Sequence, residues 1–392
     1  MNMDSQVKKQ EEPISISSND IVKLSDTAFF TLTEIEQEAS GLQYGLYSRF
    51  PNLNAAVLKY FRFGNIYAIG GPSSHGKSYL SNHLLFDFTD RTKIVVPLSK
   101  IKDHIADYIL QHGMFTEEKG HLVHHPINES FNVPTITIYC GYEVDFTKEN
   151  VRTLSALTGF GYDYILSSKV NEEIRKTKKI YEYNQLTDDE LTASKTVLEA
   201  YLSTRKSTFF VKRPQKMSQL HNYCKTIYQY YKQKRPDVKL ILFIDHILLS
   251  VAERPQDESF KMMNSAIKTL MDIRADCNAL IVPLYQFNSD IESPARTTNP
   301  ALHIPIKSDI YMGGQFYQGC DFIFGAMMPE KLGITKFLPK GYPTENLFFM
   351  QLMKARFGQT GGINLYNDLA HGKFKRAELG RNAKDELAWL PL

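Results

Sequence analysis

Cysteine is scarce in this chain of 392 residues, which contains four. Cys140, Cys224, Cys277 and Cys320 are far apart in the sequence, with no close pair at the spacing of a metal site. This spacing argues against a disulfide framework and is typical of buried, reduced thiols. We therefore expect a protein of a cytoplasmic compartment.

Long apolar runs are also absent. The longest one, LILFIDHILLSV, is interrupted by Asp245 and His246 and is too short to span a bilayer. The first twenty residues are polar and do not contain the apolar core of a signal peptide. The sequence therefore predicts a soluble protein that does not associate with a membrane.

The excess of positive charge is small, because 46 basic residues face 43 acidic ones for a net charge of +3. Such a balance predicts no polyanionic partner, although a local basic surface stays possible. Residues 211–235 are the strongest example, since they contain basic residues interleaved with tyrosines and no acid. This stretch is compatible with binding of single strands by charge and stacking. An amphipathic helix that covers a sheet is the favoured interpretation.

Short apolar runs rich in Ile, Val and Phe alternate with helical patterns from residue 43 to the C-terminus, and 43% of all residues are hydrophobic. Near-continuous apolar strands that alternate with helices predict an α/β domain with a largely parallel sheet. Residues 1–42 are more polar and predict a loose tail, with one possible helix for subunit packing at residues 25–39. Two stretches look like additions to the domain, residues 90–132 and residues 168–206.

The segment GGPSSHGKS matches the pattern G-x-x-x-x-G-K-[ST], and it lies between a predicted strand and a predicted helix. In this pattern the backbone N–H groups and the helix N-terminus hold phosphates, and the lysine reaches the β- and γ-phosphates. The alternative is a glycine-rich turn that only joins strand to helix. We expect ATP to be bound by the residues of this loop, namely Gly71, Ser74, His75, Gly76, Lys77, Ser78 and Tyr79.

Two acidic residues are placed to complete such a site. Asp245 ends the apolar run KLILFID, and together with the hydroxyl of Ser78 it is predicted to hold Mg²⁺. Glu143 follows the run TITIYCGY and is the candidate base for the attacking water, whereas Asp145 is expected in a turn or a helix cap. An ordinary carboxylate at the end of a strand is the alternative for Glu143.

The motifs also resemble a known family when they are taken in order. They read GNIYAIGGPSSHGKS, YCGYEVDFTKENVRTLSALTG, KLILFIDHILL, IVPLYQFN, SDIYMGGQFYQGCDFIFGAMMPEKLGI and KARFGQTGGINLYND. This set, over residues 41–374, resembles the RecA-like motor domain of DnaB-like replicative hexameric helicases, especially the phage versions. The resemblance implies a RecA-like P-loop NTPase core, with a mostly parallel twisted sheet flanked by helices and a C-terminal β-hairpin.

The resemblance assigns further roles to individual residues. The family has an arginine nine residues after its catalytic glutamate, and Arg152 has this spacing from Glu143. The earlier run TKIVVPLSK ends without a glutamate, so we interpret residues 90–132 as an insertion. Gln286 matches the family's sensor of the γ-phosphate. Lys354 and Arg356 match a pair that reaches the ATP site of a neighbouring subunit, which implies a homo-hexameric ring.

The function implied by the resemblance is ATP-dependent translocation on single-stranded DNA and unwinding of forked DNA, with a primase or a helicase loader as possible partners. Two departures from the family pattern weaken parts of this expectation. About forty residues precede the motor where the family usually has a further domain. In the loop that tracks DNA, the residues Ile310, Tyr311 and Met312 replace basic or polar ones.

Other functions therefore stay open. One is a RecA-type recombinase or accessory DNA-dependent ATPase, and another is a nucleotide-gated scaffold with weak turnover. Separately, the histidines His121, His124 and His125 form a cluster in the predicted insertion. With few carboxylates at ligand spacing, a surface loop is favoured over a metal site.

Overall fold

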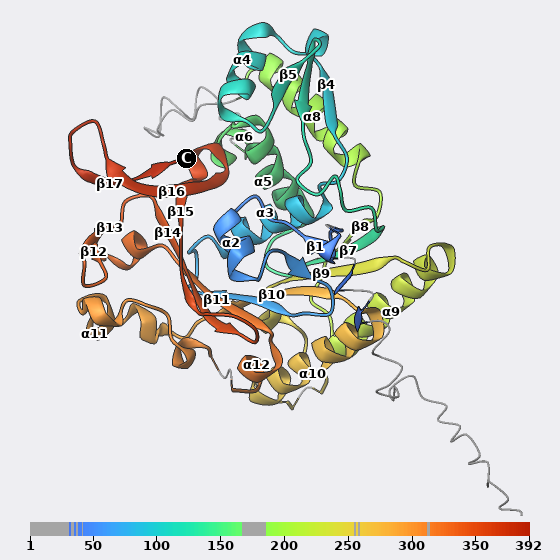
Figure 1. Cartoon of the computed structure of the whole chain (residues 1–392), viewed down its shortest axis with the longest axis vertical. Coiled ribbons are helices and arrows are strands. Elements are labelled where there is room, and N and C mark those ends of the chain that lie inside the picture. The colour runs from blue at the N-terminus through green and yellow to red at the C-terminus, as the bar shows by residue number, and fades with distance from the viewer. Residues whose placement is uncertain are drawn as a thin grey trace, which may run out of the picture. The chain divides into compact units, whose positions relative to one another are not determined.

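The computed structural model (Figure 1) describes residues 31–32, 35–36, 38–40, 42–166, 186–254, 256–257, 259–311 and 314–392. The chain divides into two compact units, Met1–Tyr44 and Gly45–Leu392. In the first unit, the residues described within the predicted helix at 25–39 are helical. Most of the predicted tail, the beginning of the predicted addition at 168–206, Met312 and Gly313 lie outside the described residues.

A ten-stranded sheet forms the centre of the second unit, and six neighbouring strands of it run parallel. All six come from the apolar runs that predict strands. In spatial order they are β8 (Thr208–Val211), β7 (Thr135–Gly141), β9 (Lys239–Asp245), β10 (Leu280–Gln286), β3 (Tyr67–Gly71) and β11 (Phe322–Met327). The order differs from the order along the chain, so the connections cross from strand to strand through helices. The predicted α/β class is confirmed.

The other four strands extend the sheet beyond β11 and run antiparallel. They are β14 (Leu347–Ala355), β15 (Gly361–Asp368), β16 (Lys373–Arg381) and β17 (Leu387–Pro391). The first two form the predicted C-terminal hairpin, which is connected by the glycine-containing turn between Ala355 and Gly361.

Helices cover both faces of the parallel strands (Figure 1). On one side α3 (Lys77–Thr89) packs against β3, β9 and β10, and α5 (Phe146–Thr158) contacts α3. On the other side lie α9 (Met217–Lys234), α10 (Ser259–Cys277) and α12 (Gly314–Gly319). Alternate residues of β3 serve the two cores: Tyr67 and Ile69 pack with the α3 side, and Ala68 packs with the α9 and α10 side. Burial on both faces explains why the strands read as continuous apolar runs.

Residues 90–132 build a separate three-stranded antiparallel sheet. Its strands are β4 (Ile94–Pro97), β6 (His121–His124) and β5 (Thr116–Glu118), and α4 (Asp103–His112) connects the first to the third. The run TKIVVPLSK thus supplies β4 of this small sheet. The strands share a third hydrophobic core with α4, α5 and α8 (Asp188–Ser203).

A buried carboxylate joins this small sheet to the main body. Asp90 is fully buried and forms ion pairs with His124 (Nε2 to Oδ2, 2.7 Å) and with Arg205 (Nη2 to Oδ1, 3.2 Å). Loss of one partner from such a buried pair typically costs about 3–5 kcal/mol. The interpretation of the histidine cluster as a surface loop was therefore wrong for His121 and His124, which lie on β6, and His124 is buried.

The remaining elements are short. They are β1 (Gly45–Leu46), α2 (Pro51–Ala56), β2 (Phe61–Arg62), η1 (Leu98–Lys100), α6 (Tyr162–Leu166), η2 (Ile247–Leu249), η3 (Ser289–Glu292), α11 (Pro294–Thr297), η4 (Pro300–Leu302), η5 (Lys307–Asp309), η6 (Pro329–Leu332), β12 (Lys336–Phe337), β13 (Tyr342–Pro343) and η7 (Leu369–His371). Among the described residues, no helix combines the length and the apolar character that crossing a bilayer requires.

Candidate functional site

The glycine-rich loop connects the end of β3 at Gly71 to the start of α3 at Lys77. Gly76 has φ of 81°, a left-handed conformation that side chains disfavour. A Cβ atom on Gly71 would lie 2.2 Å from the carbonyl oxygen of Ala326, in the neighbouring strand β11. The loop therefore needs glycine at both positions, and its tight turn brings the backbone N–H groups to the N-terminus of α3.

Lys77 lies in the first turn of α3 and is buried. Its Nζ donates a hydrogen bond to the carbonyl oxygen of Pro72 at 2.5 Å. Burial lowers the pKa of Lys77, and the negative charges of Asp245 and Glu143 act in the opposite direction. The amine therefore stands in the field of both predicted acids, which come from strands β9 and β7.

Asp245 is the last residue of β9, as predicted, and only 1% of it is exposed. Its carboxylate accepts a hydrogen bond from the Ser78 hydroxyl, while burial raises the pKa of the acid. One hydroxyl and one carboxylate beside a phosphate loop fit Mg²⁺, which keeps several waters and phosphate oxygens as ligands. No group of three or more His, Cys, Asp or Glu side chains in the described ranges has the geometry of a metal cage.

Glu143 lies two residues beyond the end of β7, in the connection to α5. Its backbone N–H donates to the carbonyl oxygen of Asp245 at 3.2 Å, and the N–H of Tyr142 donates to the same atom at 2.8 Å. These bonds fix the connection against the end of β9, while the Glu143 side chain is exposed at the pocket. Asp145 caps α5 by accepting from the N–H groups of Thr147 and Lys148 at 2.8 and 3.1 Å, as predicted.

A pocket opens between these elements, and it contains most of the residues that the sequence predicts. Gln286 reaches it from the end of β10, where it pairs with Gly71 of β3. Arg152 reaches it from α5, and its guanidinium lies 5.0 Å from the centre of the Tyr79 ring. The loop residues that line the pocket are Ser73, Ser74, His75, Gly76, Lys77, Ser78 and Tyr79.

His75 ties the loop to the segment after β11. Its Nδ1 accepts a hydrogen bond from the N–H of Met328 at 3.0 Å. Burial, together with the charges of Lys331 and Lys77, lowers the pKa of His75 to about 4. The imidazole is therefore neutral at physiological pH and acts as an acceptor within the loop.

Sequence reasoning missed three residues that line the pocket, Lys331, Leu369 and His246. Lys331 lies on η6 and its Nζ donates to the carbonyl oxygen of Ser74 at 2.7 Å. Leu369 begins η7, between the antiparallel strands β15 and β16. Both come from parts of the chain far from the loop in sequence, and neither belongs to a recognisable pattern. His246 had a signal, because it directly follows Asp245.

Lys354 and Arg356 lie at the other end of the sheet. Lys354 of β14 pairs with Ile323 at the start of β11, whose neighbour in β3 is Ala68, whereas the phosphate loop begins after Gly71. The Nζ of Lys354 donates to the carbonyl oxygens of Tyr317 and Gln318 at 2.6 and 3.0 Å, at the end of α12. The two cations are thus not placed to act on the nucleotide pocket of their own chain.

Arg356 is the freer of the two cations. Its Nε bonds to the buried carboxylate of Asp321 at 3.1 Å, while 45% of its side chain is exposed. Asp321 also holds Arg274 of α10 at 3.2 Å. The arginine therefore stands on an anchored base and presents its outer part to solvent.

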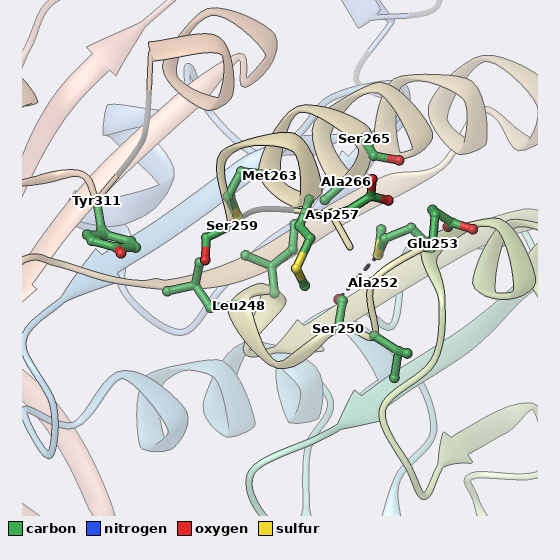
Figure 2. A pocket seen from close by; sticks show the side chains of 14 residues that line it. Leu248, Ser250, Ala252, Glu253, Asp257, Ser259, Met263, Ser265, Ala266 and Tyr311 are labelled. Carbon is green, nitrogen blue, oxygen red and sulfur yellow. Dashed lines mark hydrogen bonds between the residues drawn. The ribbon is translucent and has the colours of Figure 1, made fainter. Parts of the chain in front are cut away.

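A second pocket follows the nucleotide pocket along the chain, since Ile247 and Leu248 come directly after His246. Figure 2 shows it between Tyr311 on one side and Glu253 on the other, with Met263 and Ala266 of α10 between them. The lining is mainly apolar and carries carboxylates on its rim.

Arg296 is a basic residue close in sequence to the predicted DNA loop. Its Nη1 forms an ion pair with the buried carboxylate of Asp309 at 2.8 Å, and only 11% of its side chain is exposed. This arginine therefore holds the local fold together and is not presented to a DNA backbone.

Comparisons with known proteins place this architecture. The solved ATPase domain of a DnaB-like helicase superposes with a TM-score of 0.59 at 15% sequence identity, over 90% of this chain and 98% of that chain. A second DnaB-like replicative helicase, solved in a study of its interactions with primase, gives a TM-score of 0.59 at 16% identity, over 90% of this chain and 68% of that chain. No protein-family model and no curated protein sequence matches the chain.

The likeness to DnaB-like helicase ATPase domains confirms the RecA-like fold class predicted from the motifs. At this level of identity it is evidence for the fold alone. Function must therefore be argued from the residues of the pocket.

Proposed function

We propose that this chain hydrolyses ATP and uses the energy to translocate on single-stranded DNA as a ring-shaped helicase. The observation that carries the proposal is the meeting of three segments at one pocket: the glycine-rich loop with Lys77, the end of β9 with Asp245, and the connection after β7 with Glu143. This is the edge at which open parallel sheets place their ligands.

Each group at the pocket has a chemical task in hydrolysis. The loop N–H groups and Lys77 bind the phosphates, which fixes the γ-phosphate for attack. Ser78 and Asp245 would hold Mg²⁺, which when bound neutralises charge on the phosphate oxygens. Glu143 orients a water molecule and accepts its proton. Gln286, at the end of the strand beside β3, contacts the γ-phosphate and senses its loss.

The proposed assembly is a ring, in which Arg356 of one subunit stabilises the transition state in the site of its neighbour. Its exposed side chain at the far end of the sheet supports action in trans. Lys354 would support it from the same strand end. A homo-hexamer is the expected form, with residues 43–392 as the motor, residues 90–132 as an insertion and the N-terminal helix in subunit packing.

For the DNA we propose the segment 307–311 and the loop that follows it. Tyr311 is 40% exposed and stands at the edge of the second pocket, where an aromatic ring can stack on a base. Lys307 lies 5.0 Å from the Tyr317 ring and faces the same segment. Forked DNA is the proposed substrate, a primase or a helicase loader is the proposed partner, and the host cytoplasm is the proposed location if a phage encodes the chain.

A strand-displacement assay on a forked duplex with a 5′ single-stranded tail tests the proposal. We expect displacement of the labelled strand with Mg²⁺ and ATP, and no displacement with a non-hydrolysable analogue. ATP turnover stimulated by DNA without displacement contradicts the helicase and favours a recombinase or accessory ATPase. Binding of ATP without turnover favours a nucleotide-gated scaffold.

A further inference from the structure

Arg152 enters the nucleotide pocket from α5 with a carboxylate held directly behind it. Glu149, one helical turn earlier, forms an ion pair with Arg152 through Nη1 and Oε1. Only 1% of the Glu149 side chain and 12% of the Arg152 side chain are exposed. The ring of Tyr79 covers the guanidinium from the other side. The arginine is therefore confined by a charge and by an aromatic face.

Glu149 is itself fixed from three directions. The Nδ2 of Asn82, on α3, donates to Oε2 of Glu149 at 3.0 Å and to its backbone oxygen at 3.2 Å. The hydroxyl of the fully buried Tyr139, on β7, donates to the same carboxylate. The Tyr139 hydroxyl also lies 3.4 Å from Oδ2 of Asp245. Three elements that border the phosphate site thus meet at Glu149.

An unpaired polar atom indicates which way the arginine is directed. Within the described part of the chain, Nε of Arg152 is a buried nitrogen with no hydrogen-bond partner. Buried donors are nearly always satisfied, and an exception in a binding pocket points to a ligand atom. A phosphate oxygen is the acceptor that best matches a guanidinium held in this way.

We propose that Glu149 is a positioning residue for ATP binding, which holds Arg152 in the pocket so that its guanidinium meets the phosphates. This inference rests on the proposed ATP site and adds a residue to it. Without the carboxylate, Arg152 is a buried cation with no counter-charge, and this arrangement is unfavourable. The side chain then turns toward solvent, and ATP must bring it back at the cost of affinity.

The test measures the affinity for ATPγS with Mg²⁺ by titration calorimetry in wild type, Glu149→Gln, Arg152→Ala and the double variant. We expect Glu149→Gln to weaken binding about tenfold, as for loss of a charge-assisted bond. We expect no further loss when Arg152→Ala is already present, since Glu149 acts through Arg152. Glu199→Gln, an exposed acid on α8, is the matched control and should bind as wild type does.

Steady-state kinetics separates positioning from a general structural defect. The KM for ATP should rise in Glu149→Gln while kcat changes less than about twofold, because uniform binding is what is lost. Equal affinity of Glu149→Gln and wild type overturns the inference, and so does a loss that adds fully to that of Arg152→Ala. Absence of ATP binding in wild type instead contradicts the ATP site itself, so the two failures are distinguishable.

If Glu149→Gln does not fold, Tyr139→Phe provides the second variant. It removes one hydroxyl from Glu149 and keeps the aromatic ring in the core. We expect binding to weaken by about two- to fivefold, as for one neutral hydrogen bond, and the effect to vanish beside Arg152→Ala. An effect of Tyr139→Phe that persists in full beside Arg152→Ala overturns the inference.

Discussion

Replacing Lys77 by alanine is expected to lower ATP turnover about a hundred- to a thousandfold, the usual cost of losing a group that stabilises phosphate charge. The amine is buried at the start of α3 and lies in the field of Asp245 and Glu143. Without it, the pocket faces a triphosphate with two carboxylates and less positive charge. Phosphate release at saturating ATP measures the loss.

The fold should survive this change, so that the loss can be assigned to chemistry. Alanine is the best helix former, and position 77 is the first residue of a helix. Far-ultraviolet circular dichroism and thermal unfolding check this point. Lys93→Ala removes an exposed lysine before β4 and serves as the matched control, with turnover equal to wild type. Turnover of Lys77→Ala within about twofold of wild type means that the loop was misread.

Mixing two inactive variants is expected to restore activity if Arg356 acts on a neighbouring subunit. Loss of an arginine finger lowers turnover by about a thousandfold or more. Loss of a general base, as in Glu143→Gln, lowers it by about a hundred- to ten-thousandfold. In a mixed ring, an Arg356→Ala subunit keeps its Glu143 and receives the intact arginine of a Glu143→Gln neighbour.

Random mixing at equal ratio makes about a quarter of the interfaces complete, because head-to-tail contacts pair each site with one neighbour. Turnover should therefore recover to about that share of wild type. Mixing Lys77→Ala with Glu143→Gln is the matched control, since both changes damage the site of their own subunit and no interface is repaired. No recovery of the Arg356→Ala mixture at any ratio contradicts action in trans.

Much of the fold and of the phosphate site follows from local sequence. Strands buried on both faces read as continuous apolar runs, which is why β3, β7, β9, β10 and β11 were predictable. Glycines are required at positions 71 and 76 by close backbone approach and by a positive φ, so the loop pattern is specific. Asp245 was predictable because a buried strand that ends in an acid directs it to the ligand edge.

The missed features all depend on which distant segments become neighbours. Lys331 meets Ser74 only because β11 lies beside β3. Glu149 looks like a surface acid in the sequence, and its burial follows from the approach of α3 and β7. His124 was placed on a surface loop because nothing local indicates its pairing with Asp90. Even so, the three-residue spacing of Glu149 and Arg152 was a usable sign of an ion pair along a helix.

The most direct measurement is single-turnover cleavage of bound ATP by Glu143→Gln, made beside its affinity for ATP. The Glu143 side chain is exposed at the pocket, next to the end of β9, where it can reach water rather than fix the phosphates. We expect the cleavage rate to fall about a hundred- to ten-thousandfold while the dissociation constant stays within about threefold of wild type. A variant that cleaves ATP at the wild-type rate, or that fails to bind ATP at all, contradicts the account.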